Sequence, residues 1–271
     1  MTTTTTTTTG KKKKLSKYLV DTIGIVTDMV RETPDTQTLR IKTPYLKDDE
    51  IPFHFKPGQF VMVRPYVEEH DKVIPRAYSI SSSPMRSMQE NGYFDLTVRQ
   101  TETPTVSKWL NDRKISDEIP FRGPYGNFVW NEKDHRCEQV FMLGGGSGIT
   151  PMKCIMEYIH DKQLPNKVEL LYSCRTHTDI IFEKELPLLA QNCDNARLQI
   201  TLTREPPDSD WKGLRGRFDK ESVQNALKDR NFDLAKTTFF LCGTPQFTTG
   251  MIDHLFEIGV DPTHIKKEKW D

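Results

Sequence analysis

Residues 140–159, VFMLGGGSGITPMKCIMEYI, constrain the fold more than any other stretch of the chain. A short apolar run leads into a glycine-rich turn, and Met152, Ile155, Met156 and Ile159 then recur with the spacing of one helix face. The stretch predicts a buried strand, a tight turn and a helix packed on a sheet. Units of this kind build parallel sheets that carry helices on their faces.

The rest of the second half repeats the alternation of strand and helix. Strands are expected at KVELLYSCRT (167–176), ARLQITLTRE (196–205) and TTFFLCGTP (237–245), with helices around ELPLLAQN (185–192) and ESVQNALKD (221–229). This pattern predicts an α/β domain over residues 136–271 whose parallel sheet is covered on both faces.

The first half has a different pattern, with β-branched and aromatic runs interrupted by proline and glycine. Strands are expected at 23–30, 36–42, 59–66, 75–81 and 93–100, with one short helix at VSKWLND (106–112). Several short strands predict a small antiparallel barrel or sandwich over residues 18–130. The polar run NEKDHR (131–136) marks the boundary, and residues 1–17, rich in threonine and lysine, are expected to be a disordered tail.

Composition narrows the classes of function. Of the 271 residues, 38 are Lys or Arg and 38 are Asp or Glu, so net charge does not indicate nucleic acid as a partner. The chain has no apolar run long enough for a membrane span and no signal peptide, and its five widely spaced cysteines fit reduced thiols, so we expect a cytoplasmic protein. The wide spacing of the cysteines also predicts no metal site or iron–sulfur cluster.

GGGSGITP (144–151) lies where a strand meets a helix, and this is a favourable position for binding a phosphate group. Gly145, Gly146, Ser147 and Gly148 would let the backbone approach the phosphate, Thr150 can cap the helix, and Pro151 suits its first turn. The pattern departs from the dinucleotide fingerprint because Pro151 stands where the third glycine is expected. A purely structural turn is the alternative.

RAYSISSSP (76–84) is unusually polar for a strand. Arg76 can bind phosphate oxygens with its guanidinium, Tyr78 offers a flat face to an aromatic ring, and Ser79 and Ser82 can donate hydrogen bonds. The segment therefore indicates a platform for a cofactor. The alternative is an exposed edge strand whose hydroxyls face water.

RAYSISS, GPYGNF (123–128), GGGSGITPM (144–152) and CGTPQF (242–247), in this order, resemble the ferredoxin–NADP reductase superfamily of flavoprotein reductases, which includes oxygenase reductases and cytochrome b5 reductase-like enzymes. PGQFVMV (57–63) and GLRGRF (213–218) add to the resemblance, which covers residues 18 to 271. It implies a six-stranded antiparallel barrel that binds flavin, followed by a domain that binds NADH or NADPH.

The resemblance also implies roles for single residues. Arg76 would pair with the flavin phosphate, Ala77 and Tyr78 would contact the flavin, and Ser79 would lie near its N5 atom. Cys242 would lie beside the nicotinamide, with Gly243 and Pro245 shaping the turn, and Glu268 and Trp270 would complete the site at the flavin ring. Ser79, Cys242 and Glu268 are the expected catalytic residues. Nucleotide phosphates would bind Gly145, Gly146, Ser147, Gly148, Thr150 and Pro151.

A few further residues indicate which flavin and which nucleotide are bound. Val106 and Ser107 begin the helix that contacts the FAD pyrophosphate in this family, although Pro104 and Thr105 replace the usual glycines, so FAD is favoured over FMN. Arg175 and the pair Thr203–Arg204 follow two strands of the α/β domain, where arginine accommodates the 2′-phosphate of NADPH. We therefore expect NADPH rather than NADH. The alternative is that both arginines bind surface carboxylates.

The resemblance implies an enzyme that moves hydride between NAD(P)H and bound FAD and passes electrons to a separate acceptor, such as ferredoxin or an oxygenase component. One alternative is a catalytically silent, nucleotide-binding accessory subunit of a larger redox complex. Another is a reductase of free flavin or ferric chelates. The sequence predicts no nucleic-acid partner.

Overall fold

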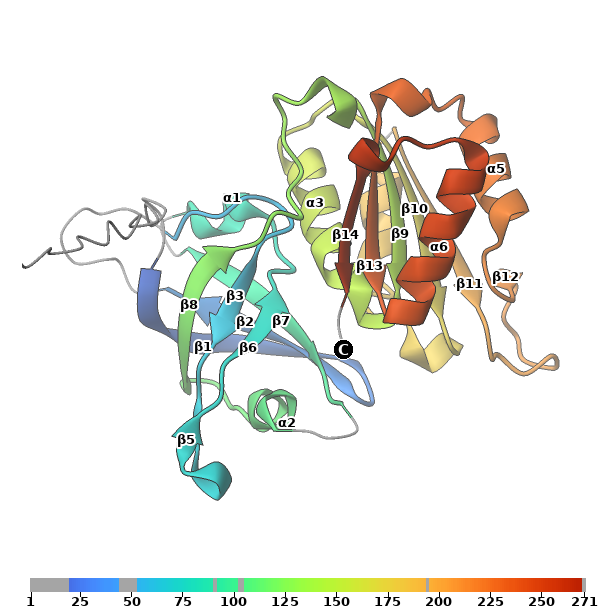
Figure 1. The fold of residues 1–271 in the computed structure, drawn as a ribbon. Helices are drawn as coiled ribbons and strands as arrows, with labels where there is room; N and C mark the ends of the chain where they lie inside the picture. The colour runs from blue at the N-terminus through green and yellow to red at the C-terminus, as the bar shows by residue number, and fades with distance from the viewer. Residues whose placement is uncertain (1–19, 44–52, 90–91, 102–104, 194, 270–271) are drawn as a thin grey trace, which may run out of the picture.

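The computed structural model describes residues 20–43, 53–89, 92–101, 105–193 and 195–269. They form two six-stranded sheets, an antiparallel one in the first half and a parallel one in the second (Figure 1). No helix within these ranges is long and apolar enough to cross a membrane.

The antiparallel sheet has the strand order β6-β3-β8-β1-β2-β7. A bridge between Ile80 and Leu96 joins its two edge strands, and this contact closes the sheet into a barrel. Inward-facing side chains such as Leu39, Ile41 and Phe121 fill the interior. The strands are β1 (Val20–Thr33), β2 (Thr36–Lys42), β3 (Phe60–Val63), β6 (Arg76–Ser79), β7 (Tyr93–Arg99) and β8 (Glu118–Tyr125).

A short hairpin and two short helices lie outside the six-stranded sheet of the barrel. A hairpin of β4 (Tyr66–Val67) and β5 (Lys72–Val73) projects between β3 and β6, and the helices are α1 (Pro84–Ser87) and α2 (Val106–Asn111). The helix predicted at 106–112 is confirmed. β8 was not among the predicted strands, because its proline and glycine interrupt the β-rich pattern.

All strands of the second sheet are parallel, in the order β12-β11-β10-β9-β13-β14. The parallel sheet expected from the alternating pattern is therefore confirmed. Its strands are β9 (Gln139–Gly145), β10 (Lys167–Cys174), β11 (Ala196–Leu202), β12 (Leu214–Arg215), β13 (Thr237–Gly243) and β14 (Ile265–Lys269). Its helices are α3 (Ile149–Asp161), α4 (Glu185–Gln191), α5 (Lys220–Asp229) and α6 (Pro245–Ile258).

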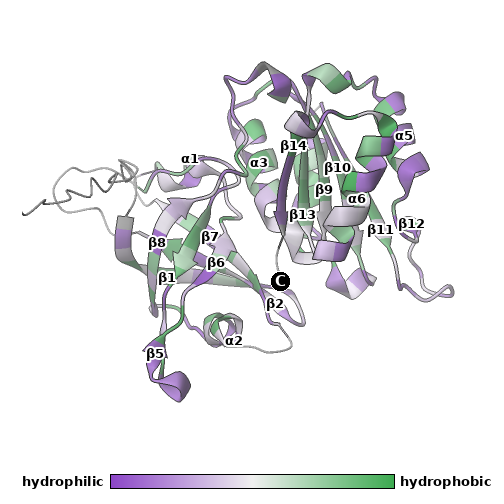
Figure 2. Cartoon of the chain, in the orientation of Figure 1, coloured by the Kyte–Doolittle hydropathy of each residue, from purple (hydrophilic) through white to green (hydrophobic). Residues whose placement is uncertain are grey.

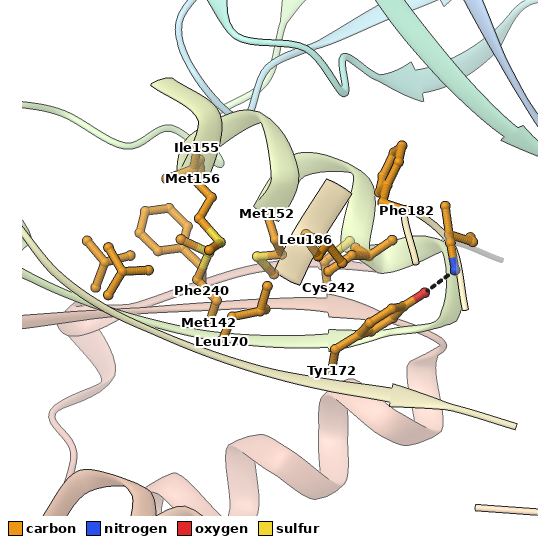
Figure 3. Close-up of a cluster of buried hydrophobic side chains, with 14 of the residues drawn as sticks. Met142, Met152, Ile155, Met156, Leu170, Tyr172, Phe182, Leu186, Phe240 and Cys242 are labelled. Carbon is orange, nitrogen blue, oxygen red and sulfur yellow. Dashed lines mark hydrogen bonds between the residues drawn. The ribbon is translucent and has the colours of Figure 1, made fainter. Parts of the chain in front are cut away.

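Two cores cover the two faces of this sheet, and β9 contributes to both by alternation. Val140 and Met142 face the helices α3 and α4, whereas Phe141 and Leu143 face α5 and α6. Apolar residues accordingly line the central strands, and the outer faces of the helices are polar (Figure 2). In the core under α3, the buried Tyr172 hydroxyl accepts a hydrogen bond from the Ile181 amide (Figure 3).

Six 3₁₀ turns connect these elements: η1 (Glu68–His70), η2 (His135–Cys137), η3 (Gly146–Gly148), η4 (His177–Asp179), η5 (Leu234–Lys236) and η6 (Pro262–His264). Between β8 and β9, the chain inserts Phe128 and Trp130 into the core under α3. The predicted boundary at 131–136 lies within this connection. The exact domain bounds stay a prediction.

Candidate active site

Strand β6 runs from solvent into the interior, because its residues go from exposed at Arg76 to buried at Ser79. Arg76 is exposed, and the structure shows its guanidinium donating to the Pro75 carbonyl. Ala77 and Tyr78 are half-buried, and burial raises the pKa of Tyr78 above its usual range. Ser79 ends the strand and is only 5% exposed.

The hydroxyls after Ser79 are bonded within the protein, and a cofactor contact for Ser82 stays a prediction. Ser82 is 1% exposed, and its hydroxyl accepts a hydrogen bond from the Asp95 amide. Ser81 bonds to the Asp95 carbonyl and the Thr97 hydroxyl, and Ser83 caps helix α1. Ser81 and Ser82 thus join the end of β6 to β7, and their buried hydroxyls have the partners that such groups need.

Ser79 and Glu268 come from different sheets and lie together. Neither Ser79 Oγ nor Glu268 Oε2, both buried, has a hydrogen-bond partner in the described part of the chain. Burial raises the pKa of Glu268 to about 7, and the nearby Ser79 hydroxyl acts in the opposite direction. Glu268 pairs with Cys242 in the register of β14 and β13. These two polar atoms therefore mark a site that a further group can complete.

The glycine-rich turn has the expected position between β9 and α3. A Cβ atom on Gly148 would lie 2.1 Å from the Cys242 carbonyl oxygen, so this turn and the end of β13 touch backbone to backbone. Thr150 does not cap the helix as expected. Its hydroxyl instead donates to the Ser147 carbonyl, and Pro151 is buried in the first turn of α3.

A pocket of about 520 Å³ opens at the carboxyl ends of the parallel strands, where sheets of this type bind ligands. Six predicted residues line it: Gly145, Gly146, Ser147, Arg175, Thr203 and Gly243. Sequence reasoning missed other lining residues, among them Arg99, Asp179, Arg217 and Phe247. Arg217 lies in GLRGRF, so that motif could have identified it.

Six predicted nucleotide contacts are not among the residues that line this pocket: Gly148, Thr150, Pro151, Arg204, Cys242 and Pro245. The Arg204 amide donates to the Arg175 carbonyl, and the Arg204 side chain is exposed. Cys242 is completely buried, and its side chain packs in the core under α3 with Met152 and Leu186 (Figure 3). Its side chain points toward α3 because of its position in the strand, and its place beside the nicotinamide stays a prediction. Pro245 begins helix α6 next to the pocket.

Arginines and carboxylates alternate at one side of the pocket. Arg99 from β7 binds Asp35 at 2.8 Å and Asp179 at 3.1 Å, and Asp179 also binds Arg175 at 2.7 Å. A Cβ atom on Gly146 would lie 3.5 Å from Arg99 Nη1, so this arginine of the barrel reaches the glycine-rich turn of the other sheet. The cluster places two guanidinium groups beside the turn, and guanidinium groups suit phosphate.

The remaining predicted residues lie elsewhere. Val106 and Ser107 are buried at the start of α2, where the Ser107 hydroxyl accepts from the Thr101 amide. Trp270 lies outside the described residues. Among the residues that are described, no group of three or more His, Cys, Asp or Glu side chains is placed to hold a metal ion.

Comparisons with known proteins agree with this architecture. The family model of the oxidoreductase FAD-binding domain matches residues 23–130, and that of the oxidoreductase NAD-binding domain matches residues 142–253. A solved structure with the same fold is the FAD/NAD-binding domain of nitric oxide dioxygenase from Vibrio cholerae O1 biovar El Tor. It is 21% identical, with a TM-score of 0.76 over 92% of this chain and 98% of that one.

Two curated relatives are more similar in sequence. The glycine betaine monooxygenase reductase subunit of Chromohalobacter salexigens is 29% identical over 89% of this chain and 62% of its own length. NADH-cytochrome b5 reductase 1 of Aspergillus terreus is 31% identical over 72% of this chain and 64% of its own length. The chain thus spans less than two thirds of either relative. With both domain families matched in this order, the chain belongs to the ferredoxin reductase family of oxidoreductases, with an FAD-binding barrel followed by an NAD-binding domain.

Proposed function

We propose that the protein is a flavoprotein reductase that oxidises NAD(P)H, reduces its bound FAD and delivers electrons to a separate acceptor. The observation that carries this proposal is the meeting of Ser79 and Glu268. Two buried polar atoms from different domains lack a partner there, next to the strand end that borders the nucleotide pocket. Buried polar groups are rarely left unpaired, and catalytic sites are a common reason for an exception.

The residues of β6 fit FAD. Arg76 has an exposed guanidinium for a phosphate, Tyr78 has an aromatic face, and Ser79 has a buried hydroxyl beside Glu268. When bound, FAD supplies the redox chemistry, because it accepts a hydride and releases electrons singly or as a pair. We infer that Ser79 and Glu268 position the reacting rings, and that Glu268 holds a proton at its carboxyl below about pH 7. FAD is preferred to FMN because the family model that matches the barrel is that of an FAD-binding domain.

We propose NADPH as the preferred donor. Arg175 and Thr203 line the pocket, and Arg217 adds a further guanidinium at its edge. An additional phosphate on the nucleotide would gain charge-assisted hydrogen bonds from such arginines. Arg175 already binds Asp179, so a phosphate would share or replace that partner.

We further propose a protein acceptor, namely ferredoxin or an oxygenase component. A relative named as the reductase subunit of a monooxygenase supports this choice. The cytoplasmic location remains a prediction from the sequence.

The test is anaerobic stopped-flow reduction of the flavin-loaded protein, first with NADPH and then with NADH, followed as bleaching of the flavin absorbance. We expect bleaching by both nucleotides with a higher second-order rate constant for NADPH. A higher constant for NADH would reverse the nucleotide assignment alone. Bleaching by neither, together with no turnover of ferricyanide, would reject the reductase and favour the silent accessory subunit.

A further inference from the structure

Helix α3 carries a buried ion pair on the side that faces the barrel. Lys153 and Glu157 stand one turn apart, are 5% and 9% exposed, and bind each other at 3.1 Å. Charged side chains are rarely buried to this extent unless they are paired. The pair holds its charges: burial alone would raise the pKa of Glu157, but Lys153, the Ser83 amide and Arg86 keep it below its usual value.

Glu157 binds the flavin domain through both of its oxygens. Oε2 accepts a hydrogen bond from the Ser83 amide at 2.9 Å, and Oε1 accepts from Arg86 Nε and Nη2 at 3.3 and 3.2 Å. Ser83 lies only four positions after Ser79 on the same segment, and the serines between them are bonded to β7. Glu157 therefore anchors the segment that carries Ser79, and Asp161 of the same helix adds a bond to Arg86 at 3.2 Å.

The N-terminal end of α3 lies at the nucleotide side of the proposed site. α3 begins directly after Gly146–Gly148, and Gly148 touches the backbone of Cys242 and Gly243. Glu157 lies nine positions after Gly148, or roughly 13 Å along a helix that rises about 1.5 Å per residue. A helix of this length moves as a rigid rod, so a shift at Glu157 would move the glycine-rich turn relative to Ser79.

We propose that Glu157, supported by Lys153 and Arg86, is a positioning residue that sets the register between the flavin strand and the glycine-rich turn. The inference depends on the proposed reductase function. A buried ion pair is a weak source of stability, because apolar residues of similar volume often stabilise a fold as well. The contacts across the domain junction instead give this pair a geometric role, and small misplacements of reacting groups have large effects on rate.

The experiment compares the flavin-loaded full-length wild type with Glu157→Gln, using whichever of NADPH and NADH reduces the wild type faster. Stopped-flow bleaching at increasing nucleotide concentration separates the limiting rate of reduction from the apparent Kd. We expect the limiting rate to fall at least about tenfold, and the apparent Kd to change by less than about threefold, because the nucleotide pocket keeps its lining. Reduction by dithionite, which does not use the nucleotide site, is expected to remain unchanged.

The matched control is Glu257→Gln, which breaks an exposed pair with Lys220 and is expected to leave all three values unchanged. If Glu157→Gln does not fold or does not bind flavin, the same measurements on Arg86→Gln test the proposal. Arg86 is partly exposed, and removing it weakens the same contact between the domains. An unchanged limiting rate in the soluble variant, even with a lower Tm, would overturn the positioning role. A wild type that neither nucleotide reduces would instead reject the reductase function itself.

Discussion

Glu268 has an environment unlike that of an ordinary surface carboxylate. Its pKa is raised to about 7 from 4.5 by burial, so in the folded protein it keeps its proton at pH values where the unfolded chain has lost it. Its contribution to stability is therefore greatest below about pH 4.5. That contribution falls as the pH rises and is fully lost above about pH 7.

Glu268→Gln is expected to remove this dependence, because glutamine stays neutral. Relative to the wild type, the variant gains on the order of 2 kcal/mol in the free energy of unfolding at pH 8.5 and nothing at pH 4.5. Thermal unfolding of both proteins between pH 4.5 and 9 measures the difference. A constant difference across this range would show that the carboxyl titrates normally, and Glu257→Gln is the exposed control.

Arg175 also has a proposed role of its own, which is to discriminate between NADPH and NADH. Arg175→Ala is expected to raise KM for NADPH about tenfold, equivalent to about 1.4 kcal/mol, and KM for NADH by a smaller factor. Steady-state kinetics with ferricyanide give both values. Arg136→Ala serves as control, because Arg136 precedes β9, at the opposite end of the sheet from the pocket. Equal increases for both nucleotides would place Arg175 away from the extra phosphate.

For single residues, the sequence predicted site residues that lie within one continuous motif. It did not predict residues that only the folded chain brings to the site. Arg76, Ser79 and the glycines of the turn follow from local patterns. Arg99 and Asp179 meet across the domain junction, so no local pattern announces them. The bond that Ser82 accepts from the Asp95 amide could not be predicted, because a hydroxyl that joins two strands has the same sequence signature as one that faces a ligand.

Among the elements, the turn between β9 and α3 has no room for a side-chain atom at Gly148. Gly148→Ala would place a methyl group 2.1 Å from the Cys242 carbonyl oxygen, and the atoms that this methyl group would meet are all backbone atoms. We expect a loss of about 2 kcal/mol in stability, since overpacked sites adjust only by moving the backbone. Urea unfolding checks this. Gly250→Ala in α6, where the methyl group meets nothing within 4 Å, is expected to stabilise slightly, and a similar loss in both variants would contradict the argument.

The elements themselves were predictable where hydrophobic periodicity was strong. The four long strands of the parallel sheet and α3 follow from apolar runs and helical spacing. β14 was missed because it is an edge strand of the sequence IKKEK, and lysine-rich edges lack an apolar pattern. α6 was missed because its first turn, with proline and two threonines, reads as a loop.

At the scale of the whole molecule, the connection between the sheets couples the two domains. Phe128 is 3% exposed and packs edge to face on Phe240, with ring centres 5.1 Å apart. Its carbonyl lies so close to Gly58 of the barrel that a Cβ atom there would be 2.1 Å away. Trp130, two positions later, bonds through its amide to the Pro57 carbonyl. The connection is therefore bonded to the barrel while its side chains fill the nucleotide domain.

Phe128→Ala is expected to uncouple the domains. Removing a buried phenyl ring costs about 3 kcal/mol or more, and here that loss falls on the core that links the nucleotide domain to the connection. We expect calorimetry of the flavin-loaded protein to show one transition for the wild type and two for the variant, with the nucleotide domain melting first. Phe256→Ala, at a phenylalanine that is 48% exposed, should unfold as the wild type does, within about 0.5 kcal/mol. A single transition in Phe128→Ala, shifted to lower temperature, would mean that the polar contacts of α3 suffice to hold the domains together.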